Sequence, residues 1–247
     1  MSKGRQTLRL DKMLVHMGCG SRSDIKRMAK QGIITVNDKR VKDSGMQVHP
    51  LDDRVEVDGE RIVYREFIYL LLHKPPGVVS ATEDLRDRTV LDLLSPEDRH
   101  FEPFPVGRLD KDTEGLLLLT NDGQLAHELL SPKKHVPKTY EARVAGDVNE
   151  EDIRHFAEGV TLDDGYATLP AQLTILSKTD TDGGPVSFIS LIIHEGKFHQ
   201  VKRMFEAVGK KVEYLKRVAM GPLVLEEELE IGTYRELTAE ELAVIGR

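Results

Sequence analysis

The feature that most constrains the fold is a run of four leucines, Leu116–Leu119, that follows a polar, acid-rich loop. A short apolar run bounded by turn residues is typical of a buried strand, and Asn121-Asp122-Gly123 supplies the turn after it. In the preceding loop, Asp110 follows Arg108 and the apolar Leu109. We therefore expect a carboxylate held rigidly, beside positive charge, at the edge of a buried strand, which suits a nucleophile.

Two other interpretations apply to this loop. Asp110, Asp112 and Glu114 ahead of Gly115 imitate the start of a calcium-binding EF-hand loop. Such a loop needs a bidentate Glu at its twelfth position and flanking helices. Asn121 stands where that Glu is required, so calcium is not expected. The remaining alternative is a solvated acidic turn without chemistry.

The bulk properties predict a cytoplasmic globular protein. A chain of 247 residues is long enough for one good-sized core and a small accessory domain. The single cysteine, Cys19, excludes an internal disulfide and a cysteine-rich zinc site, and suits a reducing compartment. Residues 1–6 lack the apolar core of a secretory signal, and no run approaches membrane-spanning length.

Charge is distributed unevenly along the chain. The net charge is -7, yet residues 1–42 contain eleven Lys and Arg against three Asp, so this segment is +8 and the remainder -15. A basic segment on an acidic body is typical of phosphate binding. The alternative is a solvated basic face.

The basic segment has the pattern of a small domain with two helices. Helical spacing in residues 10–17 ends at Gly18, and Ser21 with Asp24 forms a capping box for a second helix that Gly32 ends. Short strands and a hairpin turn are expected after it, at residues 33–36, 55–57 and 58–59.

This pattern resembles an S4 RNA-binding domain over residues 8–58, through Arg9-Leu10-Asp11, Ser21-Arg22 and Gly32 with Val36-Asn37-Asp38. The resemblance implies a basic helical face that binds structured RNA through its backbone, a mode of contact that positions a protein without reading sequence. The predicted RNA-binding residues are Arg9, Arg22, Lys26, Arg27, Lys30 and Lys39. Residues 64–66 are expected to link this domain to a second one.

Residues 67–247 predict an α+β domain with a mostly antiparallel sheet flanked by helices. Strands are expected at 68–72, 116–119, 140–144, 173–176 and 188–193, and helices at 90–94, 124–130, 150–158 and 198–208, with a capping box at 238–241. Residues 74–77 read as a turn, Ser95-Pro96 as a helix end, and residues 178–184 as a polar surface loop.

Three segments of this domain together resemble pseudouridine synthases: Gly107-Arg108-Leu109-Asp110, Lys138-Thr139-Tyr140 and His199-Gln200-Val201-Lys202. The resemblance implies that Asp110 attacks the substrate nucleoside and that Tyr140 lies against the uracil. It also implies that Lys202 pairs with Asp110, with Arg203 as the alternative. The remaining candidates for substrate binding are Gly107, Arg108, Leu109, His199, Gln200 and Arg203.

The same residues also have plainer interpretations. Tyr140 would be an ordinary strand tyrosine, and Lys202 and Arg203 would be solvated helix cations. His194 and His199 are five residues apart with Gly196 between them, which does not fit the i,i+4 helical zinc motif, so no metal is expected. No glycine-rich nucleotide loop occurs, and an isomerisation needs no cofactor.

The S4 domain and the catalytic segments together resemble the RsuA-type ribosomal RNA pseudouridine synthases, a family that also includes RluB, RluE and RluF. The segment 197–205 resembles its small-subunit members. We therefore expect isomerisation of a uridine in small-subunit (16S) ribosomal RNA, naked or in an assembling particle, by a monomer. The carboxylate would attack ribose C1′, add to uracil C6 or remove a ribose proton. The alternatives are a large-subunit (23S) enzyme, a non-catalytic S4 protein that binds ribosomal RNA, and, least supported, an S4-bearing methyltransferase.

Overall fold

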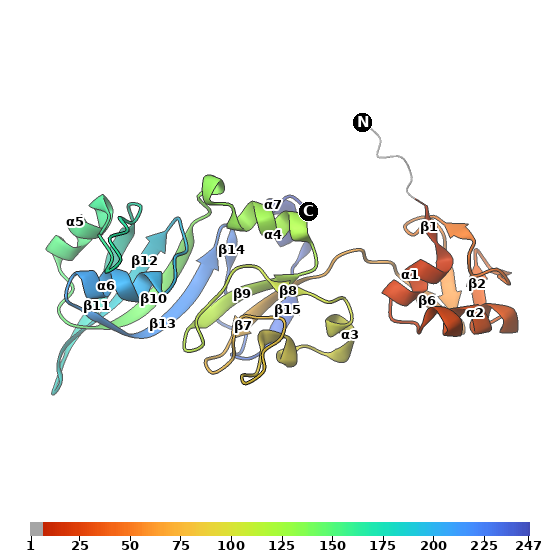
Figure 1. The fold of residues 1–247 in the computed structure, drawn as a ribbon, viewed down its shortest axis with the longest axis horizontal. Helices are drawn as coiled ribbons and strands as arrows, with labels where there is room; N and C mark the ends of the chain where they lie inside the picture. Colours follow the sequence, from red (N-terminus) through yellow and green to blue (C-terminus); the bar gives the residue numbers. More distant parts are fainter. Residues whose placement is uncertain (1–6) are drawn as a thin grey trace. The chain divides into compact units, whose positions relative to one another are not determined.

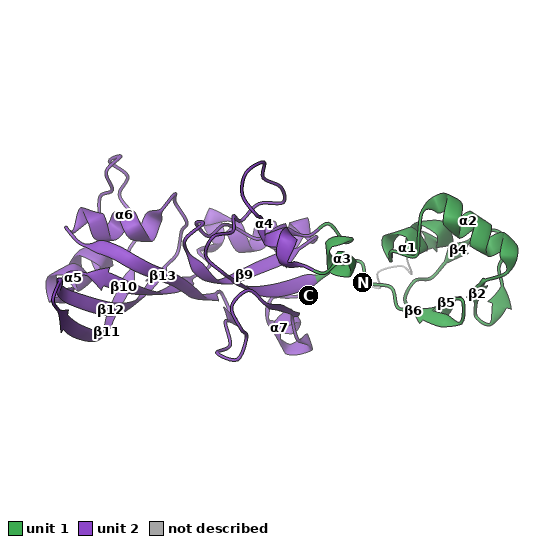
Figure 2. Cartoon of the chain, turned by 90° about the horizontal axis from the view of Figure 1, so that it is seen from below, with its two compact units in different colours: residues 1–68, 95–102 green, residues 69–94, 103–247 purple. Residues whose placement is uncertain are grey.

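The computed structural model describes residues 7–247, and the chain divides into two compact units (Figure 2). Unit 1 comprises the residues up to Ile68 together with Ser95–Glu102. Unit 2 comprises Tyr69–Leu94 and Pro103–Arg247. Within residues 7–247, no helix has both the length and the apolar character needed to cross a membrane.

Unit 1 contains the two predicted helices, α1 (Leu10–His16) and α2 (Arg22–Gln31). Ser21 and Asp24 form the predicted capping box at the start of α2, and Gly32 ends it with a positive φ of 72°. The inward faces of both helices pack on the small sheets and bury a continuous apolar cluster. The strands are β1 (Leu8–Arg9), β2 (Ile34–Val36), β3 (Lys39–Arg40), β4 (Gln47–Val48), β5 (Val55–Val57) and β6 (Glu60–Ile62).

These strands form two small antiparallel sheets, a β1–β4 pair and a sheet of order β3-β2-β5-β6. The hairpin between β5 and β6 turns at Asp58 and Gly59, with φ values of 55° and 81°. Asp-Gly suits such a turn because both residues tolerate positive φ. The predicted strands and hairpin of this unit are therefore confirmed.

The segment Ser95–Glu102 contains a short helix that was not predicted. The helix expected at residues 90–94 is a 3₁₀ helix, η1 (Val90–Leu93), and it ends before Ser95 as predicted. The Ser95 hydroxyl then accepts a hydrogen bond from the Asp98 amide and starts α3 (Pro96–Arg99), with proline at its first position. Just after α3, the His100 side chain contacts the Val15 carbonyl at 3.0 Å, within unit 1.

Unit 2 is organised around a mostly antiparallel sheet of order β11-β12-β10-β13-β9-β7-β15, with β14 on β13 and β8 on β9 (Figure 1). The pairing of β13 with β9 is parallel, and there Arg217 lies opposite Gly115. The predicted α+β class is confirmed. The strands are β7 (Tyr69–Lys74), β8 (Phe104–Pro105), β9 (Glu114–Thr120), β10 (Lys138–Ala145), β11 (Gln172–Thr181), β12 (Gly184–Ile193), β13 (Lys211–Met220), β14 (Leu223–Val224) and β15 (Tyr234–Glu236).

The helices of unit 2 follow the predicted positions closely. They are α4 (Gly123–Leu130), η2 (Pro132–Lys134), α5 (Glu150–Glu158), α6 (Gln200–Ala207) and α7 (Ala239–Val244). The predicted capping box of α7 is present at Thr238 and Glu241. α5 packs against β11 and α6 against β13, and the buried rings of Phe156 and Phe205 join the two helices with centroids 4.9 Å apart.

Four predictions in unit 2 are corrected by the structure. The first strand, expected at residues 68–72, is β7 and continues to Lys74, which was assigned to a turn. Most of residues 178–184 are not a loop, because β11 continues to Thr181 and β12 begins at Gly184. The segment is the exposed end of a hairpin, with only Asp182 and Gly183 in its turn. α6 begins at Gln200 rather than Phe198, since His199 has a left-handed φ of 49°. No element was predicted at residues 211–220, where β13 lies in the middle of the sheet.

Candidate active site

Asp110 lies in the loop that leads into β9, and the main chain of this loop is held by hydrogen bonds from a buried lysine, Lys74. The Lys74 side chain is 0% exposed, and its Nζ donates to the carbonyls of Asp110 at 3.0 Å and Thr113 at 2.9 Å. A third bond of 3.0 Å goes to the carbonyl of Pro75. Burial lowers the pKa of Lys74 to about 8. At neutral pH the ammonium still has the three N–H groups that these carbonyls use.

A second contact holds the residue before the carboxylate. The Ser80 hydroxyl donates to the Leu109 carbonyl at 2.9 Å and accepts from the Leu109 amide at 3.1 Å. The Leu109 side chain is buried, as its role as an apolar anchor predicts. The main chain at Asp110 is therefore tied to the core on both sides, which preorganises its side chain.

The Asp110 carboxylate faces two basic side chains from α6 and the residue before it. Lys202 Nζ lies 3.7 Å from one carboxylate oxygen, and His199 Nε2 lies 3.6 Å from the other. Lys202 makes shorter bonds of 2.7 and 2.8 Å to Asp112, and the hydrogen bond from Lys202 lowers the pKa of Asp112. The lysine thus bridges two carboxylates of the loop.

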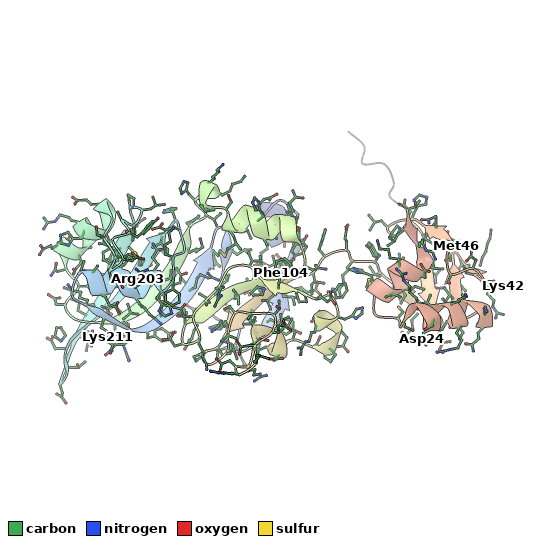
Figure 3. All side chains as sticks on the ribbon, in the orientation of Figure 1. Asp24, Lys42, Met46, Phe104, Arg203 and Lys211 are labelled. Carbon is green, nitrogen blue, oxygen red and sulfur yellow. The ribbon has the colours of Figure 1, made fainter. Side chains whose placement is uncertain are left out.

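Arg203, the alternative partner, faces elsewhere. Its guanidinium bonds to Asp163 at 2.6 Å and to Asp164 at 2.7 Å, in the turn that follows α5 (Figure 3 labels Arg203 on α6). Successive residues on a helix point about 100° apart, so only one of the two adjacent cations can face the Asp110 loop. In the structure that residue is Lys202.

A cavity of about 740 Å³ opens beside Asp110, within the size range of small-molecule sites. Its lining includes most of the predicted site residues: Gly107, Arg108, Leu109, Asp110, Tyr140, His199 and Gln200. Tyr140, on β10, is 7% exposed. Arg108 is exposed at the cavity, and Gly107 has a positive φ of 78° with Leu130 close behind it.

The segment before α6 places an aromatic ring at the cavity. Phe198 is 74% exposed and stacks on His199, with ring centroids 3.8 Å apart. The left-handed backbone at His199 directs the two rings together outside the helix. Gln200, predicted to bind substrate, is buried and bonds to Glu195 at 2.7 Å and to the Lys197 amide at 2.8 Å, so it braces this segment.

Two buried cations of the site were not predicted from sequence, Lys74 and Arg217. Arg217 lines the cavity from β13, opposite Tyr140 on β10, and is 1% exposed. The one signal for it in the sequence is the alternation of Leu215, Arg217 and Ala219, which places an arginine in phase with apolar residues.

The predicted RNA-binding residues of unit 1 are exposed. Arg22, Lys26 and Lys30 follow one another at intervals of four residues along α2 and so share one face. Arg9 is paired with Asp11 and Arg27 with Asp24, each at 2.7 Å, while Lys39 lies on β3. Lys3 and Arg5, counted in the basic segment, lie outside the described residues.

Comparisons with known proteins match both units. The family model for RNA pseudouridylate synthase matches residues 68–207, and that for the S4 domain matches residues 8–55. A solved structure titled pseudouridylate synthase has 37% sequence identity and a TM-score of 0.65, covering 96% of this chain and 99% of its own.

Three relatives span nearly the whole chain. The RNA pseudouridine synthase YtzG of Bacillus subtilis is 55% identical over 96% of this chain and 98% of its own. Ribosomal large subunit pseudouridine synthase B of the same organism is 41% identical over 95% and 93%. Ribosomal small subunit pseudouridine synthase A of Vibrio cholerae is 41% identical over 96% and 99%.

Proposed function

This chain belongs to the RNA pseudouridylate synthase family and has an S4 domain at its N-terminal end, and we propose that it isomerises a uridine of ribosomal RNA with Asp110 as the catalytic carboxylate. The observation that carries the proposal is the position of Asp110. The carboxylate lines a cavity, its main chain is fixed by Lys74 and Ser80, and two basic side chains face it.

The reaction detaches uracil from ribose, rotates it and rejoins it through carbon instead of nitrogen. Atoms and electrons balance within the substrate, so the chain's own residues can supply all the chemistry. Attack at C1′, addition at C6 and removal of a ribose proton all require an ionised carboxylate beside the nucleoside. Lys202 Nζ, 3.7 Å from the Asp110 carboxylate, places a positive charge beside it.

The uridine must leave its stack to reach this cavity, at a cost of a few kcal/mol. Tyr140 would stack on the uracil and take part in the proton transfer at C5. Arg108, exposed at the cavity, would enter the gap that the flipped nucleotide leaves in the RNA.

For the substrate we propose small-subunit ribosomal RNA, because the segment 197–205 resembles small-subunit enzymes. Large-subunit RNA is the alternative, since relatives named for each subunit have equal identity to this chain, 41%. Carbodiimide mapping by primer extension, on both RNAs incubated with the protein, distinguishes the two. A new stop in small-subunit RNA supports the proposal, and a stop only in large-subunit RNA transfers the same chemistry to the other substrate.

Asp110→Asn tests the role of the carboxylate in the same assay. We expect no stop with this variant and nearly unchanged RNA binding, because the amide cannot act as a nucleophile or base but keeps the shape of the side chain. Asp87→Asn is the matched control, since Asp87 is a partly exposed carboxylate that pairs with Lys111, the residue after Asp110. Turnover by Asp110→Asn would refute the assignment. Binding without any stop, in naked RNA and in assembling particles, would favour a non-catalytic S4 protein.

The face of α2 is the proposed RNA contact of unit 1. Replacement of Arg22, Lys26 and Lys30 by Gln should weaken binding and reduce the slope of log K against log salt by about 2 to 3, as expected for three lost phosphate contacts. Arg54→Gln, in the same unit but paired with Glu56, is the control. An unchanged slope in the triple variant would exclude this face as the RNA contact.

A further inference from the structure

Arg217 is a buried cation in the wall of the cavity, and its charge has no partner of opposite sign among residues 7–247. Its Nε donates to the Leu116 carbonyl at 2.8 Å, which fixes the guanidinium between β9 and β13. Its Nη2 is buried and has no hydrogen-bond partner, and in residues 7–247 no carboxylate lies within ion-pair distance of this side chain. A buried charge without a partner is costly, so such a group is expected to meet a ligand.

A second cation, Lys138, lies on the same side of the cavity. Burial lowers the pKa of Lys138, the nearby charge of Arg217 lowers it further, and Glu195 acts in the opposite direction. Glu195 is already engaged, because it accepts hydrogen bonds from the Tyr166 hydroxyl, the Leu169 amide and Gln200. This side of the cavity therefore favours a group that carries or develops negative charge.

The position of Arg217 indicates that it would contact the base of an RNA ligand and not a backbone phosphate. Arg217 is 1% exposed and lies beside Tyr140, the residue proposed to stack on the uracil, whereas Arg108 and Phe198 are exposed. A backbone phosphate stays close to the exposed side chains, but a flipped base enters beside Tyr140. We propose that Arg217 donates a hydrogen bond to a carbonyl oxygen of the flipped uracil and stabilises the charge on the detached base. This inference rests on the proposed pseudouridylation and adds a residue to it.

The chemistry accounts for a cation at this point. The bond from C1′ to N1 breaks with its electron pair on the uracil, so negative charge spreads over N1, O2 and O4. The bond from C1′ to C5 then forms from the same ring, the proton on C5 leaves, and N1 takes up a proton. A guanidinium at a carbonyl oxygen therefore binds more strongly as the bond breaks, and an interaction that strengthens in the transition state raises kcat.

The test combines a protein variant with a substrate change. Arg217→Gln removes the charge and Lys216→Gln is the matched control, because the adjacent residue on a strand points to the opposite face. We expect Arg217→Gln to lower kcat by about 10- to 100-fold, the range for losing a hydrogen bond from a charged donor. The dissociation constant for RNA should stay nearly unchanged, Arg217→Lys should recover part of kcat, and Lys216→Gln should resemble the wild type.

The substrate arm begins with the unaltered protein, and that measurement does not depend on the folding of a variant. RNA with 2-thiouridine or 4-thiouridine at the mapped target replaces one carbonyl oxygen by sulfur, a weaker acceptor. One of the two substitutions should slow the wild type, and Arg217→Gln should be insensitive to that same substitution. Such coupling would not arise if the arginine only supported the fold.

Three results would overturn the inference. They are wild-type kcat in Arg217→Gln, equal sensitivity of both proteins to the thio substitutions, and a loss confined to RNA affinity with a reduced salt slope, which would indicate a phosphate contact instead. A wild-type protein that forms no pseudouridine would instead refute the proposed function itself, so the two failures are distinguishable.

Discussion

Gly115→Ala is expected to destabilise unit 2 strongly, because Gly115 allows β9 and β13 to approach each other at the cavity. A Cβ at this position would lie 2.2 Å from the Arg217 carbonyl oxygen and 2.7 Å from the Arg217 nitrogen. These atoms belong to the main chain, so no side-chain rotation can relieve the contact. The two strands would have to move apart at their parallel pairing, where Arg217 lies opposite Gly115.

The magnitude follows from two costs. Gly115 has a φ of 111°, which a residue with a Cβ adopts only at a cost of roughly 1–2 kcal/mol. Overpacking a rigid site adds about 1–3 kcal/mol. Together they predict a loss of about 2–5 kcal/mol in the free energy of unfolding, a large part of the 5–15 kcal/mol typical of a domain. Activity should fall as well, since Arg217 and the Asp110 loop both depend on β9.

Urea unfolding measures the effect as a lower midpoint with an unchanged slope. Gly123→Ala is the control, because Gly123 starts α4, has no positive φ and has no atom near the position of an added Cβ. That variant should be as stable as the wild type or slightly more stable, since alanine favours helix. Equal midpoints for Gly115→Ala and the wild type would refute the close approach of the two strands.

Two further predictions concern the Asp110 loop. Lys202→Gln should lower kcat by about 10-fold or more, because Lys202 contacts Asp110. The matched variant Arg203→Gln should keep the wild-type kcat, because Arg203 bonds to Asp163 and Asp164 instead. The opposite pattern of activities would reverse this assignment. Burial lowers the pKa of Lys74 from 10.5 to about 8. Between these pH values the unfolded chain therefore binds more protons than the folded one. The contribution of Lys74 to the free energy of unfolding then rises with pH, by up to about 3 kcal/mol. Urea titrations at pH 8 and about pH 10 should show that rise in the wild type and lack it in Lys74→Met, whereas parallel profiles would contradict the perturbed pKa.

Local signals predicted much of the fold because each is contained in a few neighbouring residues. The predicted capping boxes at Ser21 and Thr238 are present, as is the hairpin turn at Asp58-Gly59. Prediction failed where a polar sequence pairs as a strand, as in residues 178–184, and where an amphipathic segment lies centrally in the sheet, as β13 does. In both places the partner strand supplies the stabilisation, and a local pattern does not contain the partner.

Short motifs along the chain were enough to identify the S4 domain, the pseudouridine synthase family and the loop with Asp110, because each motif is made of a few neighbouring residues. The folded chain was needed to show that Lys202 rather than Arg203 faces Asp110, that Lys74 holds the loop, and that Arg217 lines the cavity. Lys74 and Arg217 are separated from Asp110 by 36 and 107 positions in the sequence. They reach the site through the pairing of β7 and β13 with β9, and the register of these strands depends on the packing of the whole sheet.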